Sequence, residues 1–137
     1  MALTRHLLLI AALAIPVAAA AATAKPALRD VPEIEETLFT VALANEVARK
    51  CDRIDARRLK GYRILFDLRA RANQLGYSDS EIRAYVESDS EKTRMRARGM
   101  AYLSANGVDP DAPETFCTFG LAEIAKSSAI GVLLRAR

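Results

Sequence analysis

The chain has 137 residues, with 20 Lys and Arg against 17 Asp and Glu, two Cys, one His and no Trp. This length fits one small domain with a single hydrophobic core, and a net charge of +3 is too small to indicate a nucleic-acid partner. One histidine and two isolated cysteines cannot supply the usual ligands of zinc or copper, so we expect no metal site.

Residues 1–24 have the layout of a cleaved secretory signal peptide. A basic start at residues 5–6 precedes an apolar run and a tract of small residues that ends at Ala24. We expect cleavage after Ala24, with Ala20 as the second choice. The alternative is an uncleaved anchor, but its 16-residue apolar stretch is shorter than the roughly 20 residues that span a bilayer.

Cleavage leaves a mature chain of residues 25–137 and predicts a periplasmic location. The only histidine, His6, leaves with the leader. The mature chain therefore has no imidazole for metal binding or for base catalysis.

The mature chain predicts an all-α domain, a small bundle of about five helices around one core. No segment alternates at period two for long enough to indicate a strand. Turn and capping residues predict the bounds of the five helices. The first runs from a cap at Asp30 to Cys51, and the second from 55 to 75. The third runs from a cap at Ser78 to a break at 88–91, the fourth from there to Asn106-Gly107, and the fifth from a cap at Asp111 to 126–128.

Two adjacent apolar stripes predict that the first helix is central. They comprise Ile34, Leu38, Val41 and Asn45, and then Phe39, Leu43 and Val47. We interpret Asn45 as a core amide with satisfied hydrogen bonds.

The second helix is predicted to bury one face and to expose a charged one. The expected buried residues are Leu65, Leu68, Ala72 and Leu75, with Tyr62 and Phe66 adjoining them. On the exposed side, the spacing predicts that Asp67 pairs with Arg63 and Arg71, and Gly76 is expected to end the helix.

Local signals are strongest for the third and fourth helices. Ser78 and Glu81 have the spacing of a capping box, flanked by a hydrophobic staple of Tyr77 and Ile82. The letters "SDSE" recur at 88–91, and we interpret them as a second helix start. A break is needed there because one straight helix would turn the apolar faces before and after it apart.

The cysteine pair is predicted to form a disulfide. Two cysteines in a small exported domain usually pair, and two free buried thiols are the alternative if export is wrong. Cys51 ends the first helix and Cys117 begins the fifth. Both lie at the same end of the bundle if these helices pack antiparallel.

Two segments are candidate partner-binding sites. The basic run Arg94, Arg96 and Arg98 could dock an acidic protein or a membrane surface, or could be solvated, with Arg94 paired to Glu91. The terminal stretch, with Ile130, Leu133, Leu134 and Arg135, could be an amphipathic interaction element. We favour the alternative for its leucines, that they close the open end of the bundle.

No sequence motif for catalysis or cofactor binding occurs. The chain has no C-x-x-C, serine-hydrolase, phosphate-loop or dinucleotide motif. The carboxylates of Asp52 and Asp55, and those of Glu33, Glu35 and Glu36, are explained by helix-start electrostatics. We therefore expect no cofactor and no enzyme activity.

The mature chain resembles a family of small exported bacterial proteins, domain of unknown function 5333. The resemblance covers nearly the whole mature chain and both cysteines. It rests on the segments "KPALRDVPEIEE", "ANEVARKCDRIDAR", "LGYSDSEIRAYVES", "RMRARGMAYL", "GVDPD" and "FC-x-x-GLAEI". It implies no assigned activity, although the names of some relatives link them to respiratory NADH dehydrogenase.

These observations favour a non-enzymatic interaction or accessory protein, whose partner is another protein or a membrane surface. A periplasmic domain that binds a small ligand is the first alternative, with a pocket lined by Tyr62, Phe66, Tyr85 and Tyr102. An accessory protein of a respiratory NADH dehydrogenase complex is the second alternative.

Overall fold

The computed structural model describes residues 24–137, and the predicted signal peptide, apart from Ala24, lies outside them. This part of the chain contains five α-helices and one two-stranded sheet. In chain order the elements are η1 (Leu28–Asp30), α1 (Pro32–Lys50), β1 (Ile54–Ala56), α2 (Arg58–Gln74), α3 (Asp79–Glu87), α4 (Asp89–Ala105), α5 (Pro113–Lys126), η2 (Gly131–Leu133) and β2 (Leu134–Ala136).

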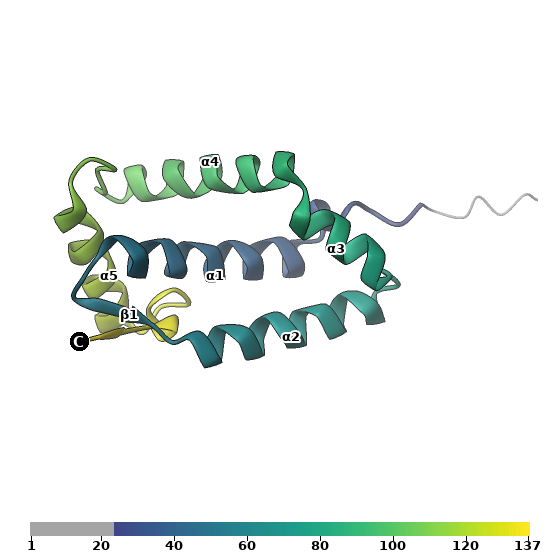
Figure 1. The fold of residues 1–137 in the computed structure, drawn as a ribbon, viewed down its shortest axis with the longest axis horizontal. Coiled ribbons are helices and arrows are strands. Elements are labelled where there is room, and N and C mark those ends of the chain that lie inside the picture. Colours follow the sequence, from purple (N-terminus) through teal and green to yellow (C-terminus); the bar gives the residue numbers. More distant parts are fainter. Residues whose placement is uncertain (1–23) are drawn as a thin grey trace, which may run out of the picture.

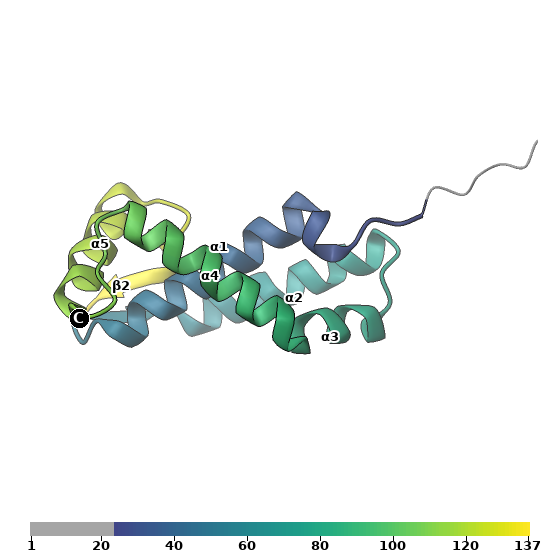
Figure 2. The same cartoon turned by 90° about the horizontal axis from the view of Figure 1, so that it is seen from above.

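Helix α1 lies at the centre, as its wide apolar arc predicts. Figure 1 shows α1 between α2 on one side and α4 on the other, with α3 joining α2 to α4 at one end. Helix α5 lies at the opposite end (Figure 1). Seen from above, α4 passes obliquely over α1 (Figure 2). The all-α prediction of five helices is confirmed.

The two strands were not predicted, because each is only three residues long. Strand β1 pairs antiparallel with β2, with Ile54 opposite Ala136 and Ala56 opposite Leu134. The sheet therefore takes the place of the first residues predicted for the second helix, which begins at Arg58 instead of Asp55. Pairing over about 80 residues of chain leaves no local signal in the sequence.

The helix starts divide into those that are capped as predicted and those that are not. Ser78 accepts a hydrogen bond from the Glu81 N–H while Glu81 bonds back to Ser78, so the capping box is confirmed. Ser88 caps α4 in the predicted break. The caps at Asp30 and Asp111 are wrong, because α1 and α5 begin after Val31 and Ala112 and rely on a proline in the first turn.

The core has two parts along the length of α1. One lies at the sheet end and contains Phe39, Leu43, Val47, Leu103, Phe116 and the disulfide, and the other lies near α3 and contains Leu28, Ile34, Leu68, Ala72 and Tyr77. Asn45 is exposed, so its interpretation as a core amide is wrong.

The outward face of α2 differs from the prediction. Tyr62 and Phe66 have 67% and 70% of their surface exposed and do not adjoin the core. Within residues 24–137, Asp67 forms no ion pair with Arg63 or Arg71, because Arg71 reaches across to Glu33 on α1 at 2.8 Å. The sequence indicates a helix in this segment, but contacts with the rest of the domain determine which face of α2 is buried.

Candidate functional site

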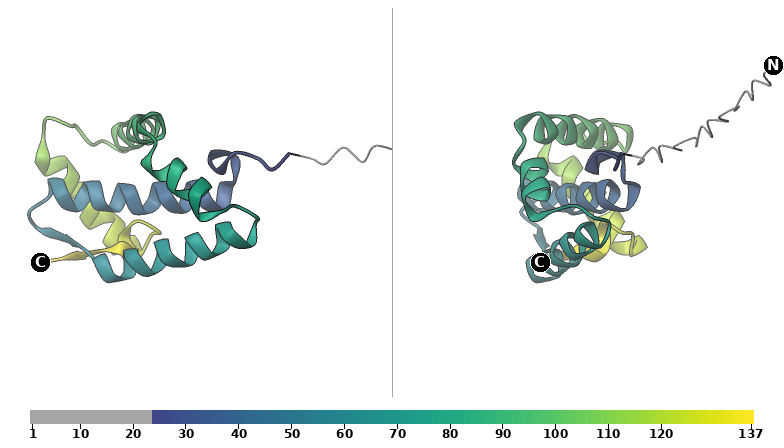
Figure 3. Two further views of the ribbon diagram at one scale, coloured as in Figure 1. Left: turned by 45° about the vertical axis from the view of Figure 1, so that its right-hand side comes forward. Right: turned by 90° about the vertical axis from the view of Figure 1, so that its right-hand side faces the viewer.

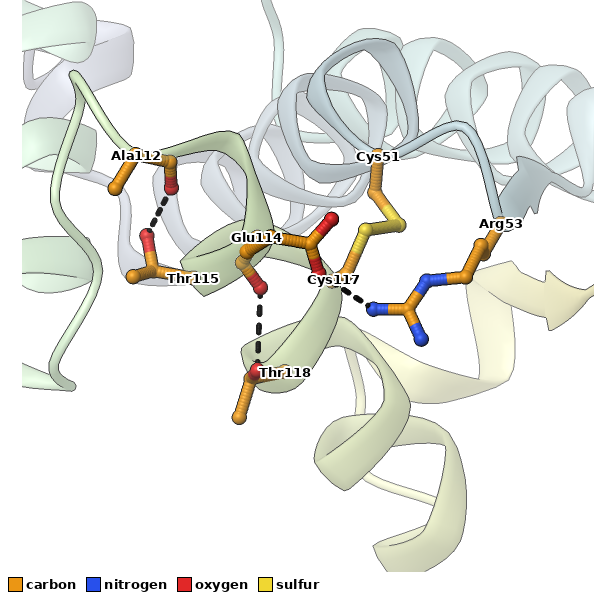
Figure 4. Close-up of a disulfide and its surroundings, with 7 residues drawn as sticks. All are labelled: Cys51, Arg53, Ala112, Glu114, Thr115, Cys117 and Thr118. Carbon is orange, nitrogen blue, oxygen red and sulfur yellow. Dashed lines mark hydrogen bonds and ion pairs between the residues drawn. A yellow bond between two sulfur atoms is a disulfide. The ribbon is translucent and has the colours of Figure 1, made fainter.

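The disulfide joins the C-terminal end of α1 to the first turns of α5. The Sγ atoms of Cys51 and Cys117 are bonded, and the Cα atoms lie 5.0 Å apart. Figure 4 shows the bond beside an ion pair of Arg53 and Glu114, which are 2.9 Å apart. The pairing is confirmed, but α5 crosses α1 at a steep angle and does not run antiparallel to it (Figures 1 and 3).

The two sulfur atoms are bonded to each other, so neither is a free thiolate. The Asp52 carboxylate lies within 4.8 Å of both of them. A metal site would need free thiolates, and a disulfide offers none.

The terminal segment is part of the core. Ile130, Leu133 and Leu134 have exposed fractions of 6%, 4% and 1%, so their side chains are not available to a partner in this structure. Of the four residues proposed for partner binding in this segment, Arg135 alone is exposed, and it lies 3.5 Å from Asp55. This burial is what the favoured alternative, a closure of the bundle, expects, and partner binding by this segment stays a prediction.

The arginine run has three different environments. Arg94 binds the buried carboxylate of Glu35 through two nitrogens, at 2.8 and 3.0 Å, and also binds Glu91 at 2.8 Å. Arg98 binds Glu36 through one nitrogen at 2.7 Å. Arg96 is exposed and forms no ion pair with any residue from 24 to 137.

Glu35 is the centre of this buried network, and sequence reasoning missed it. Its carboxylate also accepts a hydrogen bond of 2.6 Å from the Tyr85 hydroxyl. Burial opposes its ionisation, but the bonds from Arg94 and Tyr85 outweigh burial and hold the pKa of Glu35 below its ordinary value. The usable signal was its position four residues before Phe39, on the apolar stripe of the helix.

At neutral pH the pKa shifts in this network favour ionised Glu35 and Arg94 and a neutral Tyr85 hydroxyl. Burial and the bond to ionised Glu35 raise the pKa of Tyr85 to about 12. The hydrogen bond to Glu35 likewise holds the pKa of Arg94 above its ordinary value. A general acid or base needs a pKa near the working pH, so these residues are suited to joining α1, α3 and α4 rather than to proton transfer.

Loss of the Glu35 charge is expected to destabilise the fold at neutral pH. Glu35→Gln should lower the free energy of unfolding by about 2 kcal/mol, because Arg94 and Tyr85 keep their burial but lose a charged acceptor. Urea unfolding followed by circular dichroism measures this. Glu36→Gln is the control, since Glu36 is 59% exposed on its side chain and its pair with Arg98 contributes at most about 1 kcal/mol.

The same comparison has an expected pH dependence. The pKa of Glu35 is lower in the folded state, so its stabilisation is present above the ordinary pKa of 4.5 and is lost as pH falls through the folded value. The difference between wild type and Glu35→Gln should therefore be full at pH 7 and shrink below about pH 4.5. A difference that grows with acidification would contradict this assignment.

Beside this network, an open groove of about 480 Å³ runs between α1 and α4. The floor is apolar, and two methionines of α4 contribute to it. The lining includes Leu38, Ala42, Leu43, Met95, Met100 and Leu103, with Tyr85 and Val86 of α3 at one end. Methionine side chains adapt to different apolar surfaces, so this floor can accept more than one shape.

The rim of the groove carries mostly basic charge. Glu46 is neutralised by Arg49 at 2.7 Å, and Lys92 lies 3.7 Å from the exposed Asp89. Arg96 also borders the groove and forms no ion pair with any residue of the described chain. The groove therefore combines an apolar floor with a rim that favours acidic groups.

The four aromatic residues proposed for a ligand pocket do not meet. Only Tyr85 borders the groove. Tyr62 and Phe66 lie on the outer face of α2, while the Tyr102 ring stacks edge-on against Phe39 and Phe119 at 5.6 and 6.3 Å. The pocket predicted from these residues is wrong.

The fold and the site describe a small disulfide-linked helical domain with an apolar groove. The chain belongs to the family of unknown function DUF5333, whose model matches residues 26–135. The family prediction is thereby confirmed. No curated protein and no solved structure matches the chain.

Proposed function

We propose that this protein is an exported, non-enzymatic interaction protein that binds an apolar helical segment of a partner protein in the groove between α1 and α4. The groove is the observation that carries the proposal. Its volume of about 480 Å³ lies within the range of binding pockets, and its floor lies between two helices, as in proteins that bind an amphipathic helix.

The charges on the rim indicate the kind of partner. Arg96 and Lys92 border the groove on α4, and the acidic residues of the lining are already bound to arginines. An amphipathic segment with acidic residues beside its apolar stripe would complement both features. Val86 is 46% exposed at one end and would add apolar contact to such a segment.

Two observations support export. They are the disulfide and the contacts of the residues that would begin the mature chain. A disulfide of a small domain is typical of an oxidising compartment. Lys25 pairs with Glu81 at 2.7 Å, and the Tyr77 hydroxyl donates to the Pro26 carbonyl at 2.6 Å. Cleavage after either Ala24 or Ala20 would keep all of these contacts. In the described part of the chain, no helix has the length and apolar character needed to cross a membrane.

A bulky side chain inside the groove is expected to abolish partner binding without unfolding the protein. Ala42 is exposed and lines the groove, so Ala42→Phe fills it while leaving the core unchanged. Affinity capture with quantitative mass spectrometry should then lose one specific protein at least about tenfold, which corresponds to about 1.4 kcal/mol. The captured protein should have an acidic amphipathic helix, and a peptide of that helix should bind the wild type alone.

The matched control is Ala101→Phe, because Ala101 is an exposed alanine of α4 that does not line the groove. It should keep the partner. Equal loss from both variants, or no captured protein that depends on Ala42, would contradict the proposal. A small apolar molecule that native mass spectrometry detects on the wild type and not on Ala42→Phe would show a ligand-binding protein instead.

A further inference from the structure

A second hollow lies at the start of α2, next to the groove, with which it shares Asn45 and Arg49. It has a volume of about 590 Å³ and is formed by β1, the first turn of α2, the last turns of α1 and the end of β2. Six of its lining residues are basic and one is acidic: Arg49, Arg57, Arg58, Lys60, Arg135, Arg137 and Asp55. Segments 49–60 and 135–137 thus meet here only because β1 and β2 pair.

The acidic residues near this hollow do not neutralise it. Asp55 is bound by Arg137 at 2.8 Å and by Arg135 at 3.5 Å, and Arg49 is bound by Glu46. Arg57 uses its Nε to bind a backbone carbonyl, and so keeps its charge. Arg58 and Lys60 have no acidic partner among residues 24–137. The hollow therefore has an excess of positive charge that an anion would balance.

An apolar stripe begins at the same place. Leu59 borders the hollow and has 86% of its surface exposed, and Tyr62 and Phe66 follow at 67% and 70%. A spacing of three and seven residues puts these side chains on one face of α2. This helix forms an outer edge of the molecule (Figure 1), and Tyr62 and Phe66 line neither the groove nor the hollow.

We propose that this surface of α2 docks on an anionic phospholipid bilayer. Lipid phosphates would lie at the basic hollow, and Leu59, Tyr62 and Phe66 would enter the boundary between headgroups and acyl chains. Arg63 is exposed four residues after Leu59 and would face the same headgroups. A row of large apolar side chains flanked by basic residues is the pattern of helices that lie in the plane of a membrane surface.

Charge and shape favour this occupant over two others. A second copy of the chain would bring two basic hollows together, and their repulsion would oppose association. A free phosphate could balance the charge of the hollow but would leave the stripe exposed to water. A bilayer satisfies both parts of the surface at once, since its phosphates and its acyl chains lie a few ångströms apart in depth.

Vesicle flotation with the full mature protein tests the proposal. Vesicles of phosphatidylglycerol and phosphatidylcholine should bind the protein, and vesicles of phosphatidylcholine alone should not. Binding should weaken as sodium chloride is raised, because surface charges are screened over about 10 Å at 0.1 M salt. Absence of binding to the anionic vesicles at low salt would overturn the proposal.

Two charge substitutions test whether vesicle binding depends on the position of the positive charge. Lys60→Glu should weaken vesicle binding by roughly tenfold or more, because each basic residue at an anionic surface contributes about fivefold and the new carboxylate is repelled. Arg83→Glu makes the same change of net charge at an exposed position of α3, away from the hollow, and should have a small effect. Equal losses from the two variants would mean that binding is non-specific, which would overturn the proposal.

The double variant Leu59→Gln with Phe66→Gln tests the stripe. Both side chains are exposed, so the melting temperature should be unchanged while binding to the anionic vesicles is lost. Unchanged vesicle binding, with glycerol phosphate as an equally good ligand, would show an anion site and overturn the membrane proposal. A concentration-dependent dimer that the same double variant abolishes would show that a second copy is the occupant.

Discussion

Reduction of the Cys51–Cys117 disulfide is expected to lower the free energy of unfolding by about 4 kcal/mol. The two cysteines are 66 residues apart, and opening this loop restores freedom mainly to the unfolded chain. For a domain of this size the loss corresponds to a fall in melting temperature of about 15–25 °C. Thermal unfolding followed by circular dichroism, with and without a phosphine reductant, measures the difference.

The control for this experiment is the double variant Cys51→Ala with Cys117→Ala. It should melt near the reduced wild type and should not respond to the reductant. Thiol titration of denatured, unreduced wild-type protein should find no free thiol. Two free thiols per chain, or equal melting with and without reductant, would contradict the role of the disulfide.

Gly131→Ala is expected to be the most damaging single replacement of a glycine. A Cβ at this position would lie 1.9 Å from the carbonyl oxygen of Glu123 on α5, which is far inside the contact distance. Backbone atoms cannot move aside as a side chain can, so η2 and β2 must shift and expose Ile130, Leu133 and Leu134. We expect a loss of about 3 kcal/mol or more in the free energy of unfolding, measured by urea denaturation.

Gly61→Ala is the matched control, because it adds the same methyl group where no atom lies within 4 Å. Gly61 is inside α2, where alanine is a better helix former, so this variant should be more stable by about 0.5–1 kcal/mol. A Gly131→Ala variant as stable as wild type would mean that η2 does not pack on α5 in this way.

Several features that depend on neighbouring residues were predictable from the sequence, although the caps expected at Asp30 and Asp111 were wrong. The capping box of Ser78 and Glu81 and the stop at Asn106-Gly107 were predicted as the structure shows them, since Gly107 has a φ of +79° that favours glycine. The break after α3 was predictable because the apolar phase changes there. The cysteine pairing followed from cysteine number and from the expected compartment.

Features that depend on distant segments were not predictable. The apolar residues of α2 could be buried on either of two faces, and packing against Leu28 and Ile34 decided that Leu68 points inward while Phe66 is left outward. The bond between Glu35 and Arg94 spans 59 residues of chain. The groove whose rim carries Arg96 and the hollow lined by Lys60 likewise depend on how separate elements pack against one another.

The pairing of β1 with β2 has a consequence for the time at which the domain can fold. Cys51 and Cys117 are both made before Leu133 and Leu134, whose side chains complete the core around them. Until the ribosome has added residue 134 and its neighbours, β1 has no partner and the disulfide end of the domain stays open. The sheet and the core around the disulfide can therefore close only after synthesis has passed β2.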